Sequence, residues 1–375
     1  MTRLGVSSAL VDGRVVDGDV EVDDGVVTRI GLPPASGGLR AVPGLVDAQV
    51  NGFDGVDLMS ATAEEVVHVS RALASRGVTS WLPTLITGPE RDVSHALRVL
   101  DAAHASAAEG GARLLGVHLE GPFLSPRRLG THPREHRRDP DPELLARLRG
   151  HSDRLGVVAV TLAPELPGAL DLVRTLVAEG VVVSLGHSDA TAAQAHAGFD
   201  AGAVAVTHCF NAMSGLHHRE PGLAGAALAR PGVTVQVVVD GHHLADDAVR
   251  VVFAAAAGRV VLVTDATAAS ARDDGAYVLA GVALEVRDGA VRNDAGDLAG
   301  SALTLDAAVR NAASLGLDPV AVLDAATAAP ARMLRRDDVG SLRPGSRADV
   351  AVLDDDLVVR EVLLGGRSIE TAGAR

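Results

Sequence analysis

Histidines and acidic side chains are concentrated in the middle of the sequence, where their types and positions suit metal chemistry. Half of the 14 histidines lie between positions 187 and 243. Glu120, His187 and His208 each lie at the end of an apolar run. Two imidazoles and one carboxylate suit a divalent first-row ion such as zinc and leave a position for water. We therefore predict a metal centre on these three residues. His118 is either a further ligand or, as we prefer, a packed neighbour of Glu120.

A second candidate catalytic group, Asp265, directly follows the apolar run 260–264. A carboxylate in that position could cap the next helix. It could equally be a general base that activates water at the metal centre and then protonates a leaving group. The residues alone leave both interpretations open.

Arginine is the candidate residue type for binding an anionic group. Arg219 presents a fork of donors that suits phosphate or carboxylate, but it could also pair with Glu220 or lie in solvent. The arginines of the stretch 124–142 are expected to be a solvated face, and His132 within that stretch is the exception that we retain. Cys209, beside His208, is expected to be a buried apolar thiol.

The elements that must position these groups alternate along the chain. Segments with helical spacing separate most of the apolar runs, as at 62–75, 89–108, 169–179 and 190–201. Strands buried on both faces that alternate with helices indicate a parallel sheet, and eight of them indicate a (β/α)₈ barrel. Polar residues follow five of the runs, so the barrel would gather them on its C-terminal rim. The predicted strands are 44–46, 79–83, 114–119, 157–162, 181–185, 203–206, 233–239 and 260–263.

Both ends of the chain differ from this middle part. Short Val-rich runs are separated by Asp-Gly pairs in residues 1–42, and similar short runs occur in 340–375. Asp-Gly between such runs is a hairpin signal. We predict that 1–42 and 340–375 form a small β-sandwich domain beside a barrel that spans 43–339.

Composition excludes several classes of function. The 375 residues include 34 basic and 48 acidic side chains, for a net charge of −14, which disfavours nucleic acid and anionic membranes as partners. All the basic residues are arginine, so a Walker lysine, a Schiff-base lysine and a carbamylated lysine are excluded. A single cysteine, no apolar leader and no long apolar run predict a cytoplasmic protein.

The motifs and their order resemble the N-acetylglucosamine-6-phosphate deacetylases of the amidohydrolase superfamily. The segment His118-Leu119-Glu120-Gly121-Pro122 is one of the matching stretches, and the resemblance covers nearly the whole chain. The others are 43–52, 130–132, 186–191, 207–213, 219–225, 240–243, 263–267, 298–301 and 340–349.

This resemblance implies a role for each matching residue. Glu120, His187 and His208 match the metal ligands, Asp265 matches the catalytic acid/base, and His132 matches the histidine that polarises the acetyl carbonyl. Arg219 and His243 match phosphate-binding residues. Further substrate contacts are implied at Thr131, Asn211, Ala212, Asp240, Leu298, Ala299 and Gly300.

The resemblance also bears on the number of metal ions. Many amidohydrolases carry His-x-His after the first strand, where this chain has Gln49-Val50-Asn51. Neutral amides are poor ligands beside imidazole, and no lysine is present to be carbamylated. We predict one divalent ion per subunit, with Zn²⁺ favoured over Fe²⁺, Co²⁺ and Mn²⁺.

The expected activity is deacetylation of an amino-sugar phosphate, N-acetylglucosamine 6-phosphate, by a homodimer or larger homo-oligomer. The alternatives are a related amidohydrolase that acts on N-acetylgalactosamine 6-phosphate or another small amide, and a sugar-phosphate sensor without catalysis.

Overall fold

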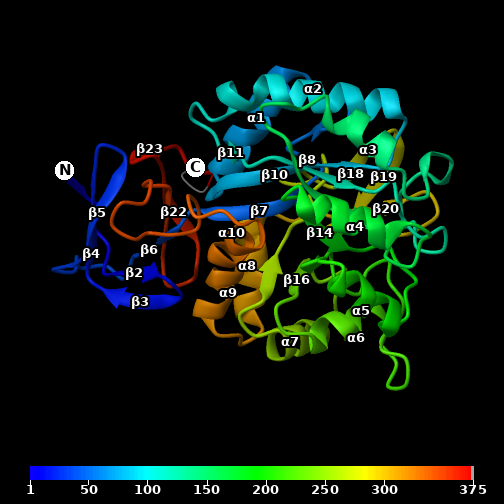
Figure 1. The fold of residues 1–375 in the computed structure, drawn as a ribbon. Helices are drawn as coiled ribbons and strands as arrows, with labels where there is room; N and C mark the ends of the chain where they lie inside the picture. Colours follow the sequence, from blue (N-terminus) through cyan, green and yellow to red (C-terminus); the bar gives the residue numbers. More distant parts are fainter. Residues whose placement is uncertain (373–375) are drawn as a thin grey trace.

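A parallel barrel forms the body of the molecule. The computed structural model describes residues 1–372 of the chain. In this part of the chain, eight strands lie side by side in a nearly closed ring surrounded by helices, which confirms the predicted (β/α)₈ fold (Figure 1). Neighbouring strands in the ring follow one another along the described chain, and only the short β8 (Gly52–Phe53), β9 (Val56–Asp57) and β11 (Arg113–Leu114) lie between them in the sequence; β11 contains the first residue of the predicted third strand. The ring strands are β7 (Leu45–Val50), β10 (Val78–Ile86), β12 (Val117–Glu120), β13 (Val157–Leu162), β14 (Val182–Leu185), β15 (Ala205–Val206), β16 (Thr234–Val237) and β17 (Val260–Leu262).

Most of the helices bury one apolar face against the barrel, whereas α6 (Gly222–Ala229) is buried on nearly all sides. Thr62 and Glu65 form a capping box that starts the first helix, which then buries Val66, Val69 and Leu73. No helix within residues 1–372 is long and apolar enough to cross a membrane. The bounds are α1 (Ala63–Ala74), α2 (Glu90–Ala107), α3 (Pro142–Arg149), α4 (Ala169–Ala178), α5 (Ala192–Asp200), α6 (Gly222–Ala229), α7 (Asp246–Ala255), α8 (Leu305–Ser314), α9 (Pro319–Ala326) and α10 (Ala328–Met333).

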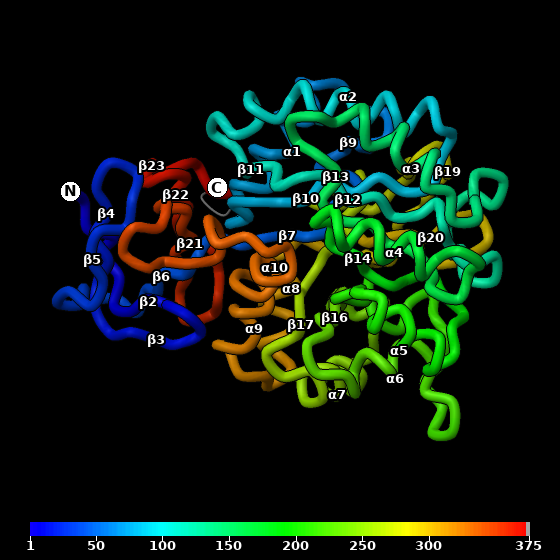
Figure 2. Tube along the Cα trace, viewed as in Figure 1, coloured from blue at the N-terminus to red at the C-terminus, as the bar shows by residue number. Residues whose placement is uncertain are grey.

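The two chain ends fold together into a small β unit beside the barrel (Figure 2). β6 leads directly into β7, so the unit lies at the end of the barrel where the strands begin. It has its own apolar core, which includes Val20, Val27, Leu342 and Val350. One sheet orders β1 (Thr2–Arg3), β4 (Asp19–Asp23) and β5 (Val26–Leu32); the other orders β23 (Arg367–Ile369), β22 (Val359–Leu364), β21 (Val350–Leu353), β6 (Arg40–Pro43), β2 (Ser8–Val11) and β3 (Arg14–Asp17).

An antiparallel insertion follows the last barrel strand and lies at the opposite end of the barrel from the β unit (Figure 1). Its strands are β18 (Gly275–Leu279), β19 (Val282–Arg287) and β20 (Ala290–Asn293). Leu279, Leu284 and Val291 form a small apolar cluster with Ile86 from the end of β10. This contact fixes the insertion over the C-terminal ends of the barrel strands. A minor hairpin, β8 (Gly52–Phe53) with β9 (Val56–Asp57), follows the first barrel strand.

Candidate active site

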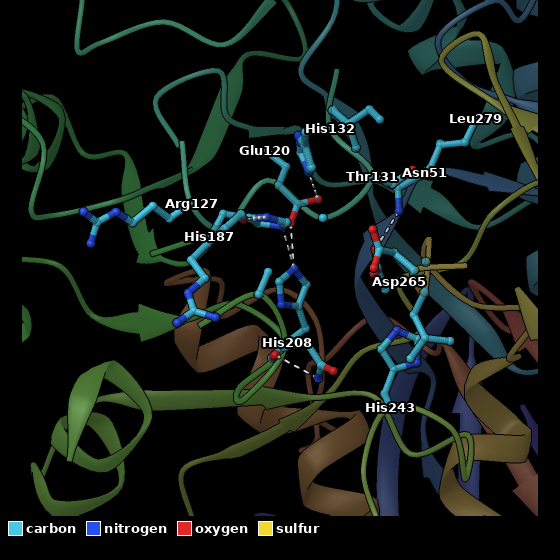
Figure 3. A pocket seen from close by; sticks show the side chains of 18 residues that line it. Asn51, Glu120, Arg127, Thr131, His132, His187, His208, His243, Asp265 and Leu279 are labelled. Atoms are coloured by element: carbon cyan, nitrogen blue, oxygen red, sulfur yellow. Dashed lines mark hydrogen bonds and ion pairs between the residues drawn. The ribbon is translucent and has the colours of Figure 1, made fainter. Parts of the chain in front are cut away.

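Glu120, His187 and His208 converge at the C-terminal end of the barrel (Figure 3). Glu120 ends β12, His187 follows β14 by two residues, and His208 follows β15 by two residues. The Nε2 atoms of His187 and His208 lie 3.1 and 2.9 Å from Oε1 of Glu120, and 3.1 Å from each other. All three side chains are buried. Three strands that are distant in the sequence therefore aim one ligand atom each at the same point.

The chemistry of this cluster fits a divalent cation. Nδ1 of His187 donates to the carbonyl of Arg128 at 2.9 Å, which orients the ring so that its Nε2 faces Glu120. Burial lowers the pKa of His208, but the hydrogen bond and charge of Glu120 outweigh it and raise that pKa to about 9. Burial opposes ionisation of Glu120, yet the two imidazoles hold its pKa well below the usual value. The cluster thus attracts positive charge, and its N, N, O donor set suits a first-row ion.

Asp265 lies beside the cluster and is buried. Its Oδ1 accepts from Nδ2 of Asn51 at 2.7 Å and from Nε2 of Gln49 at 2.9 Å. Within residues 1–372, no donor binds its other oxygen, Oδ2. Burial and the charge of Glu120 raise the pKa of Asp265. One oxygen is therefore held in place while the other is available for proton transfer.

Gln49 and Asn51 occupy the place where His-x-His would stand. Nε2 of Gln49 donates to Asp265 and also to Oε2 of Glu120 at 3.2 Å, so this amide joins the candidate base to a candidate ligand. Carboxylates only accept, so both amides must present nitrogen toward them and their oxygens elsewhere. Sequence reasoning treated these residues only as missing ligands and did not foresee this bracing role.

His132 lines the pocket on the other side of Glu120, with its Nε2 4.0 Å from Oε2 of that residue. Its Nδ1 lies 3.3 Å from the backbone nitrogen of Thr87 and 2.9 Å from the Thr87 hydroxyl. Burial, and then the charge of His187, lower the pKa of His132 to about 3. The ring is therefore neutral, and because Nδ1 accepts from an amide, its proton lies on Nε2.

Backbone geometry at the site is unusual in the same way at three positions. His187, His208 and Asp265 have φ values of 47°, 30° and 51°, in the left-handed region that L side chains seldom adopt. Such conformations persist where the surroundings over-determine them, and they cluster at functional sites. Gly300 (φ 61°) packs closely against the turn at Asp265. A Cβ at position 300 would lie 2.8 Å from the carbonyl oxygen of Asp265, so only glycine allows this approach.

A cavity of about 370 Å³ opens above the cluster. Most of the predicted substrate contacts line it, and they come from the loops after several different strands. Leu279, Asp297 and Ile86 add walls contributed by the insertion and by β10. The predicted residues on the lining are Thr131, His132, Asn211, Ala212, His243, Leu298 and Gly300, together with the cluster and Asp265.

Three predicted contacts are not on that lining. Ala299 is buried behind its neighbours. Asp240 accepts from the backbone nitrogens of His242 and His243 at 2.8 Å each, and from Nδ1 of His243 at 2.7 Å. Its carboxylate is therefore occupied within its own loop, and it orients His243 instead of facing the pocket.

Arg219 is the third predicted contact outside the lining. It lies in the exposed segment 215–220 between β15 and α6, and its Nη1 lies 2.8 Å from Nε2 of His218. The arginines that do line the pocket are Arg127 and Arg128, which the sequence had suggested were a solvated face. Both are paired with Asp189, at 3.2 and 2.7 Å. Their place directly before the Gly130–His132 stretch is the signal that could have identified them.

The two remaining predicted neighbours have structural surroundings. His118 is not part of the cluster: Nδ1 and Nε2 lie 3.2 and 2.8 Å from the hydroxyls of Thr84 and Thr161. Burial lowers its pKa to about 4, so it is a neutral, fully paired ring below Glu120. Cys209 is buried, as expected.

Comparison with known proteins gives a consistent picture. The sequence profile of the Amidohydrolase family matches residues 40–369. An N-acetylgalactosamine-6-phosphate deacetylase of Escherichia coli O157:H7 is 40% identical and covers 95% of this chain and 96% of its own. An N-acetylglucosamine-6-phosphate deacetylase of Bacillus subtilis (strain 168) is 34% identical and covers 92% and 91%.

A solved structure resembles the whole chain. It is a variant N-acetyl-D-glucosamine-6-phosphate deacetylase from Mycobacterium smegmatis in complex with N-acetyl-D-glucosamine-6-phosphate. It superposes with a TM-score of 0.91 at 34% identity and covers 98% of each chain.

Proposed function

The chain belongs to the amidohydrolase family, and from this premise we propose that it hydrolyses the acetamide of N-acetyl-D-glucosamine 6-phosphate to acetate and D-glucosamine 6-phosphate. The observation that carries the proposal is the position of Asp265 beside the buried Glu120, His187 and His208, at the base of a cavity of about 370 Å³. The names of relatives that cover most of the chain support the same substrate class.

One divalent ion would be held by Glu120, His187 and His208, and we propose Zn²⁺. When bound, such an ion supplies Lewis-acid chemistry, which acidifies water and polarises a carbonyl. The amides of Gln49 and Asn51 already donate to carboxylates, which supports a single ion.

The side chains of this chain would carry the protons of the reaction. Oδ2 of Asp265 takes a proton from water as the water oxygen attacks the acetyl carbon. Nε2–H of His132 donates to the oxygen that becomes negative in the tetrahedral intermediate. Asp265 then delivers its proton to the nitrogen as the C–N bond breaks, so acetate and the free amine leave.

The sugar phosphate would be held by the loops around the cavity. We propose contacts at Thr131, Asn211, Ala212, Leu298 and Gly300, with His243 at the phosphate. Asp240 would act through His243, since it occupies Nδ1 of that ring and leaves Nε2 free. Ala299 would support its neighbours from behind.

We also propose a homodimer in which Arg219 reaches the pocket of a second copy and serves there as a phosphate ligand. Its place on the exposed segment 215–220, outside the lining of its own pocket, supports this arrangement. Leu216 in the same segment is 51% exposed, which is a large exposure for a leucine.

Two proposals concern the chain as a whole. We propose that 1–42 and 340–375 form one domain and 43–339 the other. The separate apolar core of the β unit supports this, and residues 373–375 lie outside the described part.

We propose a cytoplasmic location, since the single cysteine is free and no oxidising compartment is needed.

The test is acetate release from both epimers by purified protein. N-acetylgalactosamine 6-phosphate is the second candidate, because the relative with 40% identity carries that name. We expect turnover of at least one epimer, its loss with a chelator, and its recovery with added Zn²⁺. Binding of the sugar phosphates without acetate release would instead indicate a sensor. A protein that neither binds the sugar phosphates nor releases acetate would refute the proposal.

A further inference from the structure

We propose that Asp47 is a positioning residue for the reaction: through Thr264 it sets the backbone turn that presents Asp265. This inference rests on the proposed function, because it takes Asp265 as the group that moves the proton. Asp47 lies on β7 and is fully buried, and it is not among the residues that line the cavity. It can therefore act on the reaction only through its neighbours.

The contacts of Asp47 connect the first and last strands of the barrel. Its Oδ2 accepts from the Thr264 hydroxyl at 2.7 Å, and its Oδ1 accepts from the backbone nitrogen of Thr264 at 3.3 Å. Oδ1 also accepts from the backbone nitrogen of Gln49 at 3.3 Å. The Asp47 carboxylate therefore holds both Thr264, which precedes Asp265 in the chain, and Gln49, whose side-chain amide donates to Asp265.

The turn at Asp265 needs such support. Its φ of 51° is left-handed, so the surroundings must hold it there. The Thr264 hydroxyl that donates to Asp47 also accepts from the backbone nitrogen of Ala266 at 3.2 Å. From the far side, Ser301 donates its backbone nitrogen to the carbonyl of Asp265 at 2.8 Å and its hydroxyl to the carbonyl of Thr264 at 2.6 Å. Asp47 and Ser301 thus clamp the turn from opposite sides.

Backbone pairing between the strands is short at this seam, where Asn51 and Gly52 donate their backbone nitrogens to the carbonyl of Ala266 at 2.8 and 3.1 Å. Seven of the eight neighbouring strand pairs in the described ring form ladders, whereas β7 and β17 are connected by a bridge between Val50 and Ala266 beyond the end of β17. The Asp47–Thr264 pair lies one step deeper in the barrel. It connects the two strand ends that carry Gln49, Asn51 and Asp265.

The presence of an aspartate at position 47 also indicates a role beyond filling space in the core. Burial raises the pKa of Asp47 to about 7, which shows that its ionised form is unfavourable in this place despite its hydrogen bonds to Thr264 and Gln49. Apolar groups of the same shape can often replace both partners of a buried hydrogen bond with little loss of stability. A carboxylate is therefore more readily explained by the turn that it holds.

The test compares two substitutions at Thr264. Thr264→Val keeps the shape and removes the hydroxyl, whereas Thr264→Ser keeps the hydroxyl. Thr79→Val is the matched control, because Thr79 is also buried on a barrel strand but lies near the start of β10. Steady-state acetate release, metal content and thermal unfolding are measured on each purified protein.

We expect Thr264→Val to lower kcat at least about 10-fold with KM changed less than about 3-fold, and Thr264→Ser and Thr79→Val to stay within about 3-fold of wild type. Metal content should be unchanged throughout. An unchanged kcat in Thr264→Val, or an equal loss in Thr264→Ser, overturns the inference. A fall in kcat that is proportional to a loss of bound metal also overturns the inference.

A second variant covers the case in which Thr264→Val does not fold. Asp47→Asn keeps the size of the side chain and one acceptor oxygen, and we expect the same selective loss of kcat. A wild-type kcat in Asp47→Asn overturns the positioning role, as does failure of both Thr264→Val and Asp47→Asn to fold. The proposed function fails separately: wild-type protein that releases no acetate refutes that function, whereas active wild type with an unaffected Thr264→Val refutes the role of Asp47 alone.

Discussion

The backbone nitrogen of Thr87 lies 3.3 Å from Nδ1 of His132, and this contact assigns the proton of the neutral ring to Nε2. A backbone amide can only donate, so Nδ1 must accept. Thr87 follows the end of β10, and His132 lies in the loop after β12. Two neighbouring strand loops thus prepare a hydrogen-bond donor that faces the cavity.

The first prediction concerns this donor. His132→Phe keeps a ring but removes the Nε2–H, so kcat should fall by about 10²–10³-fold, as when one oxyanion donor is removed. KM should change far less, because the donor acts on charge that develops in the transition state. Steady-state kinetics with metal analysis check this. His136→Phe, at a half-buried position of the same loop, is the control; equal losses in both would contradict the assignment.

The second prediction concerns Asp265. Asp265→Asn keeps the hydrogen-bond geometry but cannot take a proton, so kcat should fall by about 10²–10⁴-fold. Bound metal, measured by elemental analysis, should remain at the wild-type level because Glu120, His187 and His208 are intact. Near-normal turnover with full metal would refute the acid/base role.

The third prediction is the pH dependence of turnover. Burial and the charge of Glu120 raise the pKa of Asp265 above 3.8, and the base must be ionised to accept a proton. Activity should therefore be present above this raised pKa and be lost as the pH falls through it. A kcat profile with metal content checked at each pH tests this. A profile that stays flat over the whole acid range in which the metal remains bound would contradict it.

The fourth prediction is the metal stoichiometry and its linkage to protons. We expect one ion per chain, and a chelator should remove activity and lower the unfolding temperature. In the metal-free protein the pKa of His208 is about 9, so its ring carries a proton at pH 7. Metal binding should displace that proton, which calorimetry in two buffers of different ionisation enthalpy would detect. Two stoichiometric ions would contradict the single-ion assignment.

The fifth prediction concerns Arg219. Homodimers of Arg219→Ala should have low kcat/KM, and homodimers of Asp265→Asn should be inactive. A purified mixed dimer would combine one Asp265 and one Arg219 in a single intact pocket, so about half of the wild-type activity should return. Differently tagged, co-expressed chains provide this mixed dimer. A monomeric protein, or a mixed dimer no more active than its parents, would contradict the role across the interface.

Much of the fold and part of the site follow from local patterns. Apolar runs of strand length, separated by segments of helical spacing, predicted the eight barrel strands in their order. Polar residues at strand ends then implied that Glu120, His187 and His208 share one rim, and the structure places them within hydrogen-bonding distance. Residue types alone excluded lysine-dependent chemistry.

Other relationships depended on the paths of loops. Arg127 and Arg219 are both arginines in polar loops, yet one lines the cavity and the other lies outside it. The insertion that supplies Leu279 has an Asp288-Gly289 turn, a signal that could have predicted its hairpin but not its place over the barrel. Asp240 and Gln49 bind neighbours whose positions local spacing does not specify.

The sequence by itself determined the order of strands, the residue types at their ends and the absence of lysine, because periodicity and composition are local properties. Tertiary structure decided which of those residues meet. Closure of the barrel brings Asp47 and Gln49 beside Thr264 and Asp265, more than 200 positions away in the chain. Such contacts depend on the summed geometry of every strand and loop between them, which no short stretch of sequence encodes.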